Sequence, residues 1–114
     1  MSDCIFCQIV DGLIPSTTVY EDEDCLAFED LNPQAPVHVL VIPKQHMISL
    51  AHVQEEDPRV LGQVMMACSR VAQQKGLAEP GYRVVTNIGK EAGQTVFHLH
   101  FHVLGGRGFH WPPG

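Results

Sequence analysis

The sequence predicts one α+β domain with an antiparallel sheet of about five strands, one long helix and a short N-terminal helix. Short apolar segments, several of them rich in β-branched residues, are separated by turns of few residues, and short turns favour antiparallel neighbours. One long segment has the apolar spacing of a helix. The 114 residues, 45% apolar and 18% charged, suffice for one buried core. We therefore expect residues 1–114 to form a single domain.

The first half of the chain supplies the short helix and three of the strands. Apolar residues in an i, i+1, i+4, i+5 pattern predict the helix, and Gly12 and Pro15 end it. Pro43 ends a β-branched, almost wholly apolar segment that reads as a central strand. The expected elements are a helix over residues 4–10, a hairpin with strands at 19–20 and 25–28, and the central strand at 37–42.

The second half supplies the long helix and two more strands. Asp57 is predicted to cap this helix, with Pro58 at its first position and Gly76 as its stop. Strands follow at 82–86 and 98–104, with a Gly-rich loop between them. The C-terminal segment 105–114 is too rich in glycine and proline for regular structure and is expected to form a tail.

Charge and hydropathy exclude several functions. The formal net charge of −6 argues against nonspecific binding to nucleic acid, which needs clustered lysine and arginine. A signal peptide and an apolar segment of membrane-spanning length are both lacking, so we expect a cytoplasmic protein with no membrane partner. The cysteines should then be free thiols, metal ligands or core residues rather than disulfides; they are Cys4, Cys7, Cys25 and Cys68.

Three histidines alternate with apolar residues near the C-terminus. If residues 98–104 form a strand, His98, His100 and His102 share one face and the apolar residues share the other. Imidazole titrates near neutral pH and serves as base, acid, nucleophile or metal ligand. Glycines bracket the segment with flexible backbone. This face is the predicted functional site.

The segment 98–104 has the pattern His-φ-His-φ-His-φ-φ, where φ is apolar, and it follows a Gly-Gln-Thr lead-in at 93–95. This pattern resembles the histidine triad (HIT) family, and the resemblance extends to residues 30–36 and 41–46. Residues 104–107 and 110–114 are similar to the Hint branch. That branch implies a HIT-like fold and a purine nucleoside phosphoramidase of two identical subunits, cleaving AMP-amine conjugates. A Fhit-like dinucleoside polyphosphate hydrolase ranks second, because that branch lacks the tail.

The resemblance also implies the role of each site residue. His100 is the nucleophile that forms a nucleotidyl-histidine, and His102 donates to the phosphate or the leaving amine. Thr95 keeps a hydroxyl where the branch commonly has serine, and Asp30 suits two ribose hydroxyls. The implied catalytic set is His98, His100, His102 and Thr95. The implied nucleotide-binding set is Asp30, Leu31, Asn87, Gly93, Gln94, Thr95, His100 and His102, with Gly93 and Gln94 acting through backbone N–H groups.

The metal question stays open at this stage. Cys4-x-x-Cys7 is a weak signal alone, but some bacterial histidine triad proteins complete a zinc site with two histidines, which here are His46 and His98. We expect one structural zinc. The alternatives are free thiols with orienting histidines, or a catalytic metal shared by the three triad histidines. His38 and His52 are predicted to be surface or hydrogen-bonded histidines, and Cys25 and Cys68 to be core residues.

A second class of function is a nucleotide- or zinc-binding protein that acts mainly through protein association. The intact triad and its lead-in favour an enzyme, because binding alone does not need a nucleophile. We also expect a homodimer in which the tail crosses the interface and brings Trp111 beside the partner's pocket; this follows from the resemblance.

Overall fold

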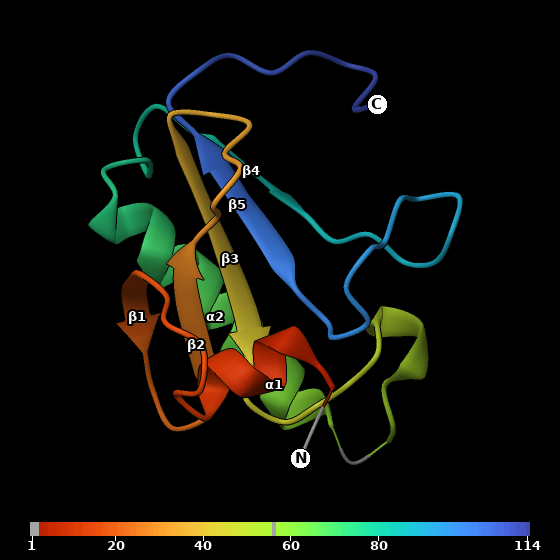
Figure 1. Ribbon diagram of the computed structural model, residues 1–114. Helices are drawn as coiled ribbons and strands as arrows, with labels where there is room; N and C mark the ends of the chain where they lie inside the picture. Colours follow the sequence, from red (N-terminus) through yellow and green to blue (C-terminus); the bar gives the residue numbers. More distant parts are fainter. Residues whose placement is uncertain (1–2, 56) are drawn as a thin grey trace.

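A computed structural model describes residues 3–55 and 57–114. The elements in chain order are α1 (Ile5–Val10), β1 (Thr18–Glu21), β2 (Cys25–Glu29), β3 (Val37–Pro43), a 3₁₀ turn (Leu50–His52), α2 (Pro58–Gln74), β4 (Tyr82–Val85) and β5 (Phe101–Gly105). The strands form one antiparallel sheet in the order β1-β2-β3-β5-β4 (Figure 1). The predicted α+β class, sheet and two helices are confirmed.

The two faces of the sheet carry different layers. Alternate residues of β3 point to opposite sides, so Val39 and Val41 join the core under α2, whereas Leu40 and Ile42 join a smaller cluster with Phe6 of α1. In Figure 1 α2 lies behind the sheet and α1 in front of its lower end. The face that carries α1 is also the face that carries the candidate site.

The amphipathic face of α2 accounts for its place against the sheet. Its buried residues recur at helical spacing, as predicted, and are Val60, Val64, Ala67, Cys68, Val71 and Ala72. Pro58 begins the helix. Asp57 is the N-cap residue, as predicted, but its carboxylate makes no capping hydrogen bond. It accepts hydrogen bonds from Gln45 Nε2 (3.1 Å) and the Gln54 backbone N–H (3.0 Å) instead.

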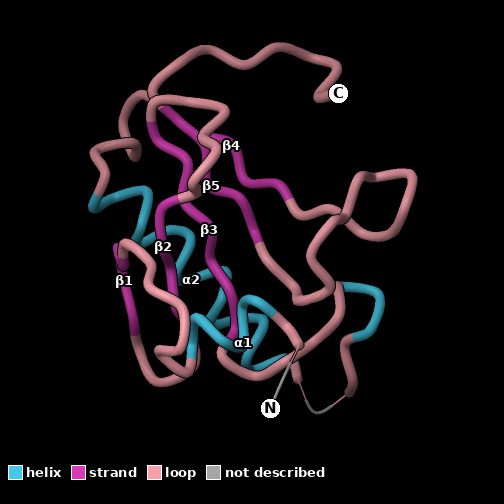
Figure 2. The backbone as a smooth tube through the Cα atoms, viewed as in Figure 1, coloured by secondary structure: helices cyan, strands magenta, loops and turns pink. Residues whose placement is uncertain are grey.

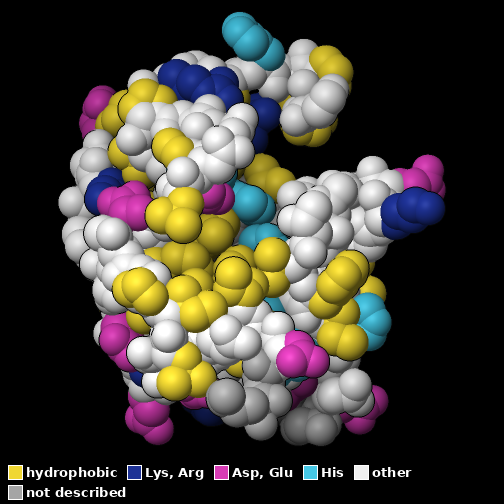
Figure 3. Space-filling model, viewed as in Figure 1, with side chains coloured by type: hydrophobic (Ala, Val, Ile, Leu, Met, Phe, Trp, Pro, Cys, Tyr) yellow, Lys and Arg dark blue, Asp and Glu magenta, His cyan; other side chains and the backbone are white. Residues whose placement is uncertain are grey.

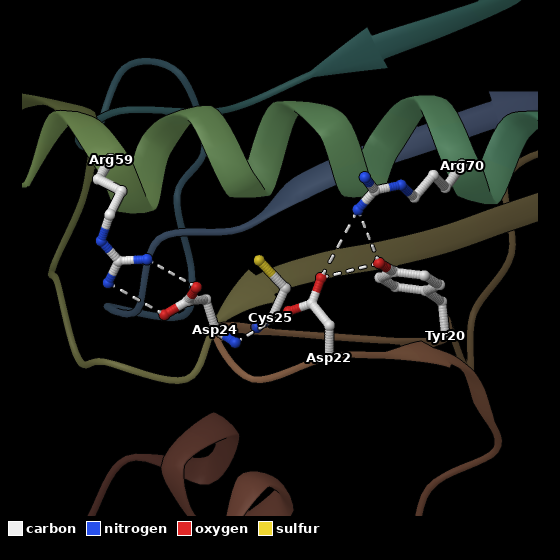
Figure 4. Close-up of polar contacts among 6 residues, drawn as sticks. All are labelled: Tyr20, Asp22, Asp24, Cys25, Arg59 and Arg70. Carbon is white, nitrogen blue, oxygen red and sulfur yellow. Dashed lines mark hydrogen bonds and ion pairs between the residues drawn. The ribbon is translucent and has the colours of Figure 1, made fainter.

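Polar contacts tie the β1–β2 hairpin to α2 (Figure 4). Tyr20 donates its hydroxyl hydrogen to Asp22 at 2.8 Å, and Arg70 of α2 donates to the same hydroxyl oxygen at 3.0 Å. Arg59, at the other end of α2, binds Asp24 at 2.9 Å. These contacts hold the edge hairpin in place, so that β2 and β3 form a fixed wall for the site.

The final strand is shorter than predicted. β5 begins at Phe101, so His98 and His100 precede the strand instead of lying on it. Pro43, at the end of β3, has no N–H to extend the ladder past the Val41–Phe101 pair, and the Leu99 N–H bonds the Met47 carbonyl at 2.6 Å. Figure 2 draws the whole connection from β4 to β5 as loop.

Along the described residues, none of the helices combines the length and the apolar character needed to cross a membrane.

Candidate active site

A cavity of about 310 Å³ opens on the sheet face that carries α1. Its walls are mainly apolar and come from α1, the loop after it, β2, the loop after β2, β3 and the β4–β5 connection. The apolar lining residues are Ile5, Phe6, Ile9, Ile14, Pro15, Phe28, Leu31, Leu40 and Val96. Asp30, Thr95, His100 and His102 supply polar groups. Figure 3 shows histidine side chains at the bottom of a hollow beside a large hydrophobic patch. The cavity therefore pairs an apolar compartment with an imidazole-lined one.

His100 is held in one tautomer by the backbone. Its Nδ1 lies 2.7 Å from the carbonyl oxygen of His98, and because a carbonyl only accepts, Nδ1 must carry the proton. The neutral ring then keeps a lone pair on Nε2. Thr86 Oγ1 donates to the His100 carbonyl at 2.8 Å, and the Phe6 ring packs edge-on against the imidazole with centroids 5.2 Å apart. In this tautomer His100 lines the cavity with Nε2 as the nitrogen that carries no proton.

His102 is oriented by a relay that begins at Gln34. The Gln34 backbone N–H donates to His38 Nδ1 at 3.0 Å, so neutral His38 carries its proton on Nε2. That Nε2 lies 2.8 Å from His102 Nδ1, which must therefore accept, and neutral His102 keeps its own proton on Nε2. Asp30 Oδ2 lies 3.3 Å from His38 Nε2. The relay makes His102 Nε2 a hydrogen-bond donor, and the His102 ring lies 5.1 Å from the His100 ring between centroids.

Burial keeps the His102 and His38 rings neutral. Burial, together with the neighbouring His100 and His38 rings, lowers the pKa of His102 to about 4 against the opposite effect of Asp30. Burial also lowers the pKa of His38, against the opposite effect of Asp30. The hydrogen-bond assignments of His38 and His102 therefore hold at neutral pH.

Cys4, Cys7, His46 and His98 form a second cluster at the N-terminus of α1. Their ligand atoms all lie within 4.8 Å of one another. His98 Nδ1 is 3.3 Å from Cys4 Sγ, 3.6 Å from Cys7 Sγ and 3.2 Å from His46 Nδ1. A tetrahedral zinc with bonds of about 2.0–2.3 Å needs ligand-to-ligand spacings of roughly 3.3–3.8 Å. The spacing and the donor set therefore fit a metal.

The tautomer of His98 fits metal binding as well. Its Nε2 lies 2.8 Å from the Pro43 carbonyl oxygen, so Nε2 carries the proton and Nδ1 offers a lone pair to the cluster. Metal-binding histidines usually donate their second N–H in this way. The side chain is fully buried, and burial lowers its pKa, which favours the neutral ligand form.

Comparison with known proteins identifies the family. Residues 11–109 match the HIT domain family. The chain belongs to the HIT domain family. An uncharacterised HIT-like protein of Synechocystis sp. is 52% identical over 112 residues, which cover 98% of this chain and 97% of that one.

Solved HIT structures share the fold over nearly the whole chain. A HIT family hydrolase from Legionella pneumophila is 46% identical, covers 98% of this chain and 100% of its own, and has a TM-score of 0.95. A HIT family hydrolase from Clostridium thermocellum is 48% identical with a TM-score of 0.91, covering 94% of this chain and 93% of its own. A histidine triad protein from Clostridium difficile is 45% identical with a TM-score of 0.91, covering 96% and 95%. The protein is therefore similar to hydrolases of the HIT family.

The triad histidines of this HIT protein do not converge on one point. The lone pair of His98 faces the cysteines, that of His100 is on Nε2, and that of His102 faces His38. No metal-compatible cluster of the described residues contains all three. This arrangement disfavours a catalytic metal shared by the triad.

Asp30, His38 and His102 also lie within metal-binding distance of one another. However, His38 Nδ1 accepts the Gln34 N–H, so a metal on Nε2 would require an imidazolate with no proton on either nitrogen. This cluster is therefore a hydrogen-bond relay rather than a metal site.

The glycine-rich lead-in is bonded within its own loop. The Gly93 N–H donates to the Lys90 carbonyl at 3.0 Å and the Gln94 N–H to the Gly89 carbonyl at 3.1 Å. The predicted binding of phosphate by these two N–H groups stays a prediction, and it requires these loop bonds to be exchanged for bonds to phosphate. The buried Gln94 amide instead clamps the loop, since Nε2 donates to the Ile48 carbonyl at 2.7 Å and Oε1 accepts from the Gly89 N–H at 2.9 Å.

The other predicted site residues divide into two groups. Asp30, Leu31 and Thr95 line the cavity with His100 and His102. Asn87 is half-buried in the β4–β5 connection and is absent from the cavity lining, as are Gly93 and Gln94.

The sequence prediction missed His38. It was expected to be a surface or hydrogen-bonded histidine, and only the hydrogen bonding holds, because its side chain is buried beside His102. The sequence feature that could have indicated this role is the single polar residue in the otherwise apolar segment 37–42.

Proposed function

We propose that this HIT protein hydrolyses the P–N bond of purine nucleoside 5′-phosphoramidates such as AMP-amine conjugates. The observation that carries the proposal is the fixed tautomer of His100, which presents a neutral, unprotonated Nε2 at the cavity beside the donor His102. In this tautomer the Nε2 lone pair of the neutral imidazole is available to attack phosphorus.

The proposed reaction has two displacements at phosphorus. His100 Nε2 attacks the α-phosphorus, a P–Nε2 bond forms, and the P–N bond to the amine breaks. The leaving amine takes a proton from solvent, while the Nε2–H of neutral His102 donates a hydrogen bond to a phosphate oxygen and keeps its proton. Water then attacks phosphorus and releases a proton to solvent, and the P–Nε2 bond breaks to give the nucleoside monophosphate and free His100.

Cavity chemistry supports a nucleotide substrate. The apolar compartment formed by α1, β2 and β3 suits a flat purine base, and a carboxylate such as Asp30 accepts hydrogen bonds from ribose hydroxyls. The exposed Thr95 hydroxyl supplies a donor for phosphate oxygens at the histidine end. The terminal His-Trp-Pro-Pro-Gly and the Leu-Gly-Gly-Arg segment support the Hint branch over the Fhit-like alternative.

We further propose a zinc ion at Cys4, Cys7, His46 and His98. These four residues would hold it in a closed tetrahedral site, and the ion would supply structural cross-linking rather than a reacting water. His98 would then orient its neighbours instead of transferring protons.

A homodimer completes the proposal. β4 is an edge strand of the sheet, and exposed apolar side chains lie on it (Tyr82), after it (Ile88) and on α2 (Met65, Met66). Phe109 stacks between the guanidinium groups of Arg83 and Arg107, with ring-centroid distances of 5.1 and 4.2 Å. After Phe109, the Trp111 side chain is 83% exposed and is therefore available to contact a partner subunit.

Steady-state assays with an AMP-amine conjugate and a diadenosine polyphosphate test the proposed activity. The wild type should prefer the phosphoramidate, and His100→Ala should abolish its hydrolysis while AMP still binds, because binding is spread over several residues. Turnover by His100→Ala within about tenfold of wild type, a loss of only ~1.4 kcal/mol, would refute the assignment. Preference for the polyphosphate would favour the Fhit-like reaction, and AMP binding without turnover would favour a binding protein.

A further inference from the structure

His98 belongs to both clusters of the site. Its Nδ1 points into the Cys4–Cys7–His46 cluster, and its backbone carbonyl accepts the Nδ1 proton of His100 at 2.7 Å. His98 thus connects the metal-compatible cluster, through its ring, to His100, through its backbone carbonyl. A displacement of the His98 ring would move the acceptor that fixes the tautomer of His100.

Helix α1 makes a second connection. Cys4 caps this helix and Cys7 lies within it, while Phe6 between them packs against the rings of both His98 and His100, with centroids 5.9 and 5.2 Å away. The same helix supplies Ile5, Phe6 and Ile9 to the cavity wall. The position of α1 therefore determines the shape of the apolar compartment.

The six residues of α1 are too few for a helix that is stable by itself. Apolar contacts of Phe6 hold α1 to β2 and β3. Contacts of Cys4 with His98 and of Cys7 with His46 hold its N-terminal end to the residues before β5 and to the loop after β3. A bound metal would convert the second set of contacts into coordinate bonds. Removing the metal would leave α1 attached by the apolar contacts and the weaker thiol–imidazole contacts.

We propose that the Cys4–Cys7–His46–His98 centre controls nucleotide affinity, because a metal there docks α1 and so assembles the nucleotide cavity. Metal and nucleotide then bind with positive coupling, and each raises the affinity for the other by the same factor. This inference rests on the proposed function only in taking the cavity's ligand to be a purine nucleotide.

Calorimetric titration of AMP into zinc-free and zinc-loaded protein tests the coupling without any turnover. AMP should bind about fivefold or more tightly to the zinc-loaded form, the lower end of typical coupling between sites. Equal affinity in the two forms would overturn the inference and leave the proposed function standing. Absence of AMP binding in the zinc-loaded form would overturn both.

Variants separate the metal effect from loss of a thiol. Cys7→Ser should weaken AMP binding to the level of the zinc-free protein and make it insensitive to added zinc, although Cys7 does not line the nucleotide cavity. Cys68→Ala removes a buried thiol from α2 on the opposite face of the sheet and should leave AMP affinity and its zinc dependence unchanged. A Cys7→Ser protein with wild-type AMP affinity contradicts the proposed docking of α1.

The reverse measurement covers the case in which the zinc-free chain does not fold. The zinc affinity of the loaded, folded protein, measured by equilibrium competition with a chelator, should rise by about fivefold or more when AMP saturates the cavity. An unchanged zinc affinity, in the presence of demonstrated AMP binding, would overturn the coupling.

Discussion

Replacement of His38 by alanine tests the relay that makes His102 a donor. The change removes the 2.8 Å bond from His38 Nε2 to His102 Nδ1 and leaves His102 free to place its proton on either nitrogen. When the proton is on Nδ1, His102 presents a lone pair to the phosphate and the leaving amine. A hydrogen bond to a charged group contributes about 1.5–3 kcal/mol, so kcat/KM should fall by roughly 10- to 100-fold.

The assay is hydrolysis of an AMP-amine conjugate with matched histidine variants. His52→Ala is the control, because His52 is exposed and bonds only to Ser49 and Gln54 in the described chain. His38→Gln places an amide N–H near the position of the lost Nε2 and should recover part of the activity. A His38→Ala enzyme within about twofold of wild type would refute the relay.

Three further predictions concern the metal, pH and the tail. Purified protein should contain one zinc per chain, which the Cys4→Ala/Cys7→Ala double variant loses, and chelation should lower thermal stability more than the initial catalytic rate; metal retained in that variant would contradict the site. The pKa of His102, lowered from 6.5 to about 4 chiefly by burial, favours the neutral ring in the folded state. The contribution of neutral His102 to the free energy of unfolding is full above pH 6.5 and falls by up to ~3 kcal/mol as the pH drops to about 4. The free energies of unfolding by denaturant at pH 7.5 and pH 4.5 should therefore differ less for His102→Asn than for wild type. Deletion of residues 109–114 should change the relative kcat/KM for different amine leaving groups in a protein that light scattering shows to be a dimer; a monomer, or an unchanged preference, would refute the cross-subunit role of Trp111.

Local patterns were sufficient to predict most of the fold. The β-branched segment 37–42 and the helical spacing from Val60 to Ala72 specify their elements through side-chain periodicity, which depends only on nearby residues. The start of β5 depends instead on where its ladder with β3 ends, at the Val41–Phe101 pair, and that register is set by contacts between distant parts of the chain. Sequence periodicity alone therefore extended the strand back to His98.

The candidate site shows the same division. The triad and the cysteine pair are sequence motifs, whereas the role of His38 arises from the pairing of β3 with β5. Leu40 lies opposite His102 in that pairing, which brings His38 to the same face and into contact with the His102 ring. The role of the Gln94 side chain likewise requires the loop after β3 to lie beside the β4–β5 connection.

The central claim, that His100 is the nucleophile, is tested most directly by trapping the covalent intermediate. Rapid acid-free quenching of the protein during turnover of an AMP-amine conjugate, followed by proteolysis and mass spectrometry, should find one adenylyl group on the peptide that contains residues 98–102, with fragmentation assigning it to His100. The group should be absent in His100→Ala and should accumulate when the second displacement is slowed. An adenylyl group on another residue would contradict the account, as would turnover with no intermediate under conditions that trap a control phosphohistidine.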